Sequence, residues 1–185
     1  TEALDKPSDC DILTPVVIEI WKEIQMAYMN QEKKAKIVAA VKPILKKYGL
    51  KGSFAVNNHS TIVLNLKSGK IDFIENYIKV DAEKAKHFSE DQVAYIRKNK
   101  AIDVNPYWFQ DHFTGKAKSA LTEIYTAMKA AGDWYDRSDA QVDYFDTAYY
   151  VDVNIGKWNK PYSVEWWLKL KLQNRKCILF INWQT

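Results

Sequence analysis

The stretch Tyr149-Tyr150-Val151-Asp152-Val153-Asn154-Ile155-Gly156 decides the fold class of this chain. Apolar and polar side chains alternate along it, which is the pattern of a β-strand with one face on the core and the other in water. Gly156 ends the run. We therefore expect an antiparallel strand over residues 147–155.

Three further segments are expected to join the same sheet. Residues 53–66 predict a hairpin, because two apolar runs flank Asn57-Asn58-His59-Ser60, and Asn and Ser suit the positive-φ positions of a tight turn. Residues 162–167 are a candidate hairpin partner for the strand at 147–155. The apolar run at 177–182 predicts a buried strand.

Helices are expected where apolar residues recur at three- and four-residue spacing. These segments are residues 15–29, 31–48, 71–78, 89–99 and 116–131. Gly49 should end the second helix and Pro43 should kink or break it, while Ser89 and Gln92 form a capping box. The order of elements predicts an α+β fold, a small antiparallel sheet packed with four to five helices.

Length and composition point to one globular domain. The chain has 185 residues, of which 47% are hydrophobic and 27% charged. Residues 1–11 are expected to be a polar leader and residues 12–185 a single domain. Cys10 and Cys177 form no disulfide framework, so two reduced thiols are expected. There is no apolar signal core and no membrane-spanning window, which predicts a cytoplasmic protein with no membrane partner.

An acidic segment precedes the strand at 147–155. If residues 136–146 were helical, four carboxylates would share one face: Asp136, Asp139, Asp143 and Asp146. Carboxylate oxygens suit Mg²⁺ and Ca²⁺, although the spacing is not that of an EF-hand loop. Three interpretations stay open, namely a solvated acidic turn with a helix cap, a metal site, and an acidic face for a partner.

Two basic groups form the other candidate surface. The first lies in the lysine-rich segment 33–51 and includes Lys33, Lys36 and Lys46. The second interleaves basic and aromatic residues near the C-terminal end: Lys157, Trp158, Lys160, Trp166, Lys169 and Lys171. Lysines that neutralise phosphates beside aromatic rings that stack on bases are typical of single-strand binding, although a solvated helix face also carries lysines.

Motifs of the common enzyme classes are missing from the sequence. It has no nucleophile elbow, no P-loop, no dinucleotide-binding glycine run and no zinc-ligand spacing. Asp111 and His112 are adjacent, and neighbouring residues of a helix or strand do not face each other. We therefore assign no catalytic residue, no metal ligand and no cofactor.

Two stretches resemble small uncharacterised proteins of bacteriophages and mobile elements, including the large polyvalent protein-associated domains. They are residues 51–65, with Lys51-Gly52-Ser53-Phe54-Ala55-Val56 and Ser60-Thr61-Ile62-Val63-Leu64-Asn65, and Asp143-Tyr144-Phe145-Asp146-Thr147-Ala148-Tyr149-Tyr150-Val151. The resemblance covers about half of the chain and departs from it at residues 15–29 and at the C-terminal end. It implies an accessory protein that binds host factors or nucleic acid.

These observations favour a non-enzymatic binding module that engages a host protein or nucleic acid through charged surfaces. Separated acidic and basic segments also suit self-association, including a homodimer. The alternative is a divalent-metal-dependent enzyme that cleaves phosphodiesters with Asp136, Asp139, Asp143 and Asp146.

Overall fold

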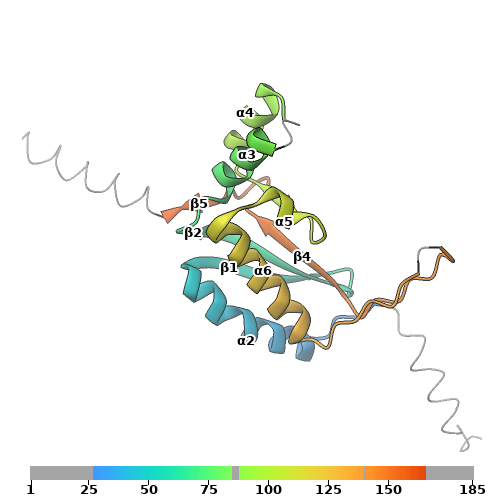
Figure 1. The fold of residues 1–185 in the computed structure, drawn as a ribbon. Coiled ribbons are helices and arrows are strands. Elements are labelled where there is room, and N and C mark those ends of the chain that lie inside the picture. Colours follow the sequence, from blue (N-terminus) through green and yellow to red (C-terminus); the bar gives the residue numbers. More distant parts are fainter. Residues whose placement is uncertain (1–26, 85–87, 140, 166–185) are drawn as a thin grey trace, which may run out of the picture.

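The computed structural model describes residues 27–84, 88–139 and 141–165 (Figure 1). Its helices are α2 (Gln31–Tyr48), α3 (Phe73–Lys84), α4 (Glu90–Asn99), α5 (Phe109–His112) and α6 (Gly115–Ala130). Its strands are β1 (Leu50–Asn57), β2 (Thr61–Gly69), β3 (Ile102–Val104), β4 (Tyr150–Ile155) and β5 (Ser163–Val164). Helices packed with a sheet confirm the predicted α+β class.

The sheet has the order β1-β2-β4-β3, with β5 paired to the end of β2. The hairpin of β1 and β2 is confirmed, and Asn58 and His59 take the expected positive φ of 50° and 57° in its turn. The prediction of an antiparallel sheet is wrong in part, because β2 pairs with β4 in parallel. In the described part of the chain between these strands there are four helices, and such a crossover lets the second strand run in the same direction as the first.

The prediction for residues 162–167 is also wrong in its partner. In its described part, residues 162–165, the strand is Ser163–Val164, which pairs in parallel with Ser68 and Gly69 of β2. The segment after β4 is instead a tight turn in which Lys157 and Lys160 exchange both backbone hydrogen bonds, at 2.9 and 3.0 Å. The strand expected at 177–182 lies outside the described residues.

The core lies between one face of the sheet and the pair α2 and α6, which pack side by side (Figure 1). Alternate residues of the two central strands face these helices in matched register, and none is more than 5% exposed: Ile62, Leu64, Leu66, Val151, Val153 and Ile155. The helices contribute Ile37, Val41, Leu45, Leu121, Ile124 and Met128. Burial of each large apolar side chain stabilises the fold by about 1.5–3 kcal/mol.

Helix ends follow the sequence closely. Asn30 caps α2 by accepting from the Lys33 amide at 2.7 Å, and Gly49 ends it in the left-handed region with φ of 64°. The predicted capping box of Ser89 and Gln92 is present at α4. Of the kink or break predicted at Pro43, the break does not occur: α2 runs through Pro43, because Pro43 and Ala39 are exposed and water can reach the carbonyl that loses its donor.

Most of the features predicted for the N-terminal segment lie outside the residues that the structure describes. The leader at 1–11, Cys10 and most of the helix at 15–29 lie there, as does Cys177. The described end of that segment, residues 27–30, is not helical. Within the described ranges, no helix is both long enough and apolar enough to cross a membrane.

Candidate binding sites

Residues 135–139 pair with residues 144–148 in a two-stranded antiparallel ribbon, so the helical arrangement considered for residues 136–146 does not occur. Bridges join Asp136 to Thr147 and Asp139 to Tyr144. The Ala148 amide donates to the Tyr135 carbonyl at 3.0 Å and closes the base of the ribbon. The orange trace between α6 and β4 in Figure 1 stands away from the sheet and its helices.

Aspartate chemistry explains why this segment is not helical. The Ser138 amide donates to Asp136 Oδ1 at 3.1 Å, and the Gln141 amide donates to Asp139 Oδ1 at 2.9 Å. Asp143 has a φ of 52°, in the left-handed region. Short polar side chains that bind nearby backbone amides compete with the helical hydrogen bonds and favour turns.

The four predicted aspartates do not share one face. Asp136 accepts from Thr147 Oγ1 at 3.1 Å, and hydrogen bonds from Ser138 lower its pKa below the ordinary value. Asp146 is buried and pairs with Arg137, whose Nε lies 2.8 Å from Oδ2. Asp139 and Asp143 are exposed. Among the described residues no three His, Cys, Asp or Glu side chains are placed to hold a metal ion.

The outer end of the ribbon carries exposed apolar side chains that were not among the predicted site residues. Val142 is 69% exposed, Tyr144 51% and Phe145 72%. We call these three residues the apolar tip. The sequence does show large apolar residues between aspartates in this segment. If the segment were helical, however, some of these apolar side chains would be expected to be buried.

The lysines predicted on α2 are divided between its two ends. Lys33 is half-buried at the start of the helix, and Lys36 pairs with Glu32 at 2.9 Å, an interaction that raises the pKa of Lys36. Lys46 lies near the other end. There it lines a pocket of about 440 Å³, together with Lys42, Leu45, Gly49, Leu50, Lys51, Gly52, Lys70 and Glu165. We call this the basic pocket.

The second basic group is described only in part. Lys157, Trp158 and Lys160 lie in the exposed turn after β4, where Trp158 is 81% exposed. Trp166, Lys169 and Lys171 lie outside the described residues. The structure therefore brings together the first three residues of this group.

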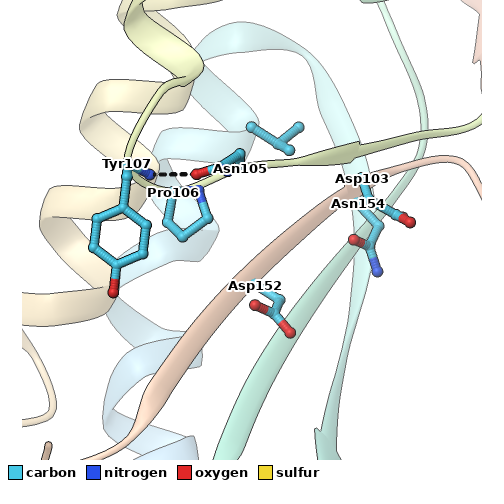
Figure 2. A pocket seen from close by; sticks show the side chains of 7 residues that line it. Asp103, Asn105, Pro106, Tyr107, Asp152 and Asn154 are labelled. Atoms are coloured by element: carbon cyan, nitrogen blue, oxygen red, sulfur yellow. Dashed lines mark hydrogen bonds between the residues drawn. The ribbon is translucent and has the colours of Figure 1, made fainter. Parts of the chain in front are cut away.

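A further pocket, of about 530 Å³, lies on the sheet face opposite α2 and α6 (Figure 2). We call it the polar pocket, and it is lined by Asp103, Val104, Asn105, Pro106, Tyr107, Asp152 and Asn154. Partial burial, and then the nearby Asp103 carboxylate, raise the pKa of Asp152. With its amide nitrogen turned toward β3, Asn154 donates to Asp103 Oδ1 at 3.2 Å. The sequence indicated a wet face on β4, but not that β3 lies beside it.

The chemistry of these surfaces differs. The polar pocket presents carboxylates and amides, which accept hydrogen bonds from cationic or hydroxyl-bearing groups. The basic pocket presents ammonium groups, and the ribbon presents apolar side chains among carboxylates. Compared with protein-family models, with curated proteins and with solved structures, the chain matches none of them.

Proposed function

We propose that this protein is a non-enzymatic binding module whose ribbon docks onto another protein. The observation that carries the proposal is the apolar tip, in which Val142 and Phe145 are 69% and 72% exposed. Aromatic side chains are enriched at the centres of protein interfaces, where burial of one ring contributes about 1.5–3 kcal/mol.

The ribbon geometry supports insertion into a partner. Its base is fixed to the body, since Trp134 Nε1 donates to the Tyr149 carbonyl at 2.9 Å and the Tyr28 amide donates to the Ala148 carbonyl at 3.0 Å. The tip lies at the far end, clear of the sheet and helices (Figure 1). A projecting segment of this kind can enter a cleft without rearrangement of the fold that carries it.

The charge of the ribbon favours a basic partner. Between residues 135 and 148 its acidic residues outnumber its one base, Arg137; they are Asp136, Asp139, Asp143 and Asp146. Carboxylates repel nucleic-acid phosphates, and complementary charge selects the partner and speeds encounter. We therefore propose a protein partner with an apolar cleft and a basic rim. In light of the phage resemblance, we propose a host protein.

The metal-dependent alternative has less support. Asp136 and Asp146 each have hydrogen-bond or ion-pair partners inside the ribbon, which accounts for them without an ion. Asp139 also holds a turn through its carboxylate. The segment is a folded acidic ribbon in which these carboxylates have partners. The feature that the fold does not explain is the exposure of the apolar tip.

The test uses the full chain and a matched pair of variants. The wild-type protein is immobilised and incubated with host extract, and the host protein that it retains is purified. The affinity of this host protein is then measured for the wild type and for each variant. Phe145→Ser should weaken binding by about tenfold or more, since exposed aromatic anchors carry much of the energy of an interface. Trp158→Ser is the control, because it removes an equally exposed ring from a basic turn and should leave the affinity unchanged.

Two results would overturn the proposal. One is a retained protein that binds Phe145→Ser as tightly as the wild type. The other is an affinity that rises with salt, since attraction between an acidic ribbon and a basic rim must weaken as salt screens it.

A further inference from the structure

The basic pocket lies at the end of α2 farthest from the ribbon. The helix has 18 residues and is therefore about 27 Å long, with the base of the ribbon near its start and the pocket at its end. Three parts of the chain supply the lysines. Lys42 and Lys46 come from α2, Lys51 from β1, and Lys70 follows β2.

Two of these lysines are held in place by the fold. The Lys70 amide donates to the Gly49 carbonyl at 3.2 Å, and its side chain lies over Gly49 so closely that a Cβ there would be 2.9 Å from Lys70 Cδ. Lys51 Nζ lies 2.8 Å from Glu165 Oε1, which also accepts from Ser68 Oγ at 3.1 Å. These ammonium groups are therefore directed by packing and by an ion pair.

The charges in the pocket do not balance. Four lysines and one carboxylate, Glu165, line it. Hydrogen bonds from Lys51 and Ser68, followed by the charges of Lys51 and Lys70, lower the pKa of Glu165, so this carboxylate is already shared. Lys42 and Lys46 stand four residues apart on one helix, where like charges repel. In the part of the chain that the structure describes, no ion pair is formed by either of them.

We infer that the basic pocket binds the phosphate group of an anionic ligand. The pocket is concave, and its floor includes the buried side chains of Leu45 and Leu50. An anion with two or more charges would offset the excess of ammonium groups and relieve the repulsion between Lys42 and Lys46. Lysine binds phosphate as a point charge, so it needs no fixed fork geometry. This site is independent of the ribbon and of the function proposed for it.

Isothermal titration of the full chain with inorganic pyrophosphate at low ionic strength tests the inference. The double variant Lys42→Gln/Lys46→Gln should weaken binding by about tenfold or more, and glutamine keeps the helix propensity close to that of lysine. Glu165→Gln should tighten binding, because it removes the carboxylate that opposes the anion. Lys98→Gln removes one lysine charge from α4, outside the pocket, and should change nothing.

A second arm identifies the source of the phosphate. A fluorescein-labelled oligothymidine is followed by anisotropy and challenged with pyrophosphate. Displacement means that the pocket takes the backbone phosphates of a single strand, whereas an oligonucleotide that does not bind means that the pocket takes a small phosphorylated ligand. The inference fails if pyrophosphate does not bind the wild type. It also fails if the double variant, shown by circular dichroism to be folded, binds pyrophosphate as well as the wild type does.

Discussion

Gly132 lies against the buried ring of Tyr149, two residues after the end of α6. A Cβ at this position would be 2.7 Å from Tyr149 Cζ and 2.9 Å from Ile37 Cδ1, and neither neighbour can move freely because both are fully buried. Gly132→Ala should therefore lower the free energy of unfolding by about 2 kcal/mol, measured by urea denaturation.

Gly115→Ala is the matched control. Gly115 has a φ of 56°, and a Cβ there would meet nothing within 4 Å. The cost should be about 1 kcal/mol, from backbone strain alone. A loss at Gly132 no larger than the loss at Gly115 would contradict the steric argument.

Asp152 makes stability depend on pH. Burial and Asp103 raise its pKa above the ordinary 3.8, so the folded protein holds this proton more tightly than the unfolded chain does. The stabilising contribution of the protonated group is complete below pH 3.8 and is lost as the pH rises through the folded-state pKa. At neutral pH the charged carboxylate opposes folding.

Asp152→Asn should accordingly raise the free energy of unfolding at pH 7 and have no effect at pH 3. Because the side chain is half-buried and solvent screens it, the gain should stay below about 1 kcal/mol. Chemical denaturation at the two pH values measures the difference. A gain for Asp152→Asn that persists at pH 3 would refute the explanation.

Among the elements, α4 depends on its cap more than on burial. None of its residues is buried, and Ser89 accepts from the Gln92 amide at 3.3 Å while the Ser89 amide donates to Gln92 Oε1 at 2.9 Å. Ser89→Ala should destabilise this helix by about 1 kcal/mol. Hydrogen exchange should therefore speed up in α4 and stay unchanged in α6.

Ser89→Asp provides the conservative comparison, since aspartate is an equally good cap. It should keep the exchange of α4 near the wild-type rate. Faster exchange in α6 for Ser89→Ala would mean that the cap stabilises the whole domain and not α4 alone.

Which elements the sequence could predict depends on how local their causes are. The helices α2 and α4 and the turn of the β1–β2 hairpin follow from caps, glycine and periodicity within a few residues, and these predictions were confirmed. The helical arrangement considered for residues 136–146 rested on spacing alone, whereas Asp136 and Asp139 accept hydrogen bonds from backbone amides two residues ahead, which is the chemistry of the acidic turn that the sequence also allowed. Strand direction was also wrong for β4, because alternation tells which face is buried and not which strand lies beside it.

For the whole molecule, stability rests on the central strands. Leu64 of β2 is fully buried opposite Val153 of β4. Leu64→Ala should lower the free energy of unfolding by about 3 kcal/mol, since deletion of a core side chain loses its transfer energy and leaves a cavity. Urea denaturation followed by tryptophan fluorescence measures this change.

Lys67→Ala, at an exposed position of the same strand, should change the free energy of unfolding by no more than about 0.5 kcal/mol. Equal effects at the two positions would mean that β2 is not the centre of the core.

The candidate sites could be predicted only in part, because both pockets join residues from segments that are distant in the sequence. Lys46 was named from its segment, but the basic pocket also needs Lys70 and Glu165, which come from distant parts of the chain. The polar pocket joins Asp103 of β3 to Asp152 and Asn154 of β4, so it exists only once these two strands pair. The exposure of the apolar tip could be predicted only if residues 135–148 were first predicted to be extended. Composition supplied the residue types, and tertiary pairing decided which of them meet.

The parallel pairing of β2 and β4 has a consequence for the nascent chain during translation. Partner residues such as Asn65 and Asn154 are 89 positions apart, so a ribosome that adds about 5–20 residues per second delivers the second strand about 4–18 s after the first. During that interval the edge of β2 that will receive β4 carries unpaired amides and carbonyls beside apolar side chains, which invites pairing with other chains. Faster translation of residues 70–150 should shorten this exposure and raise the soluble yield.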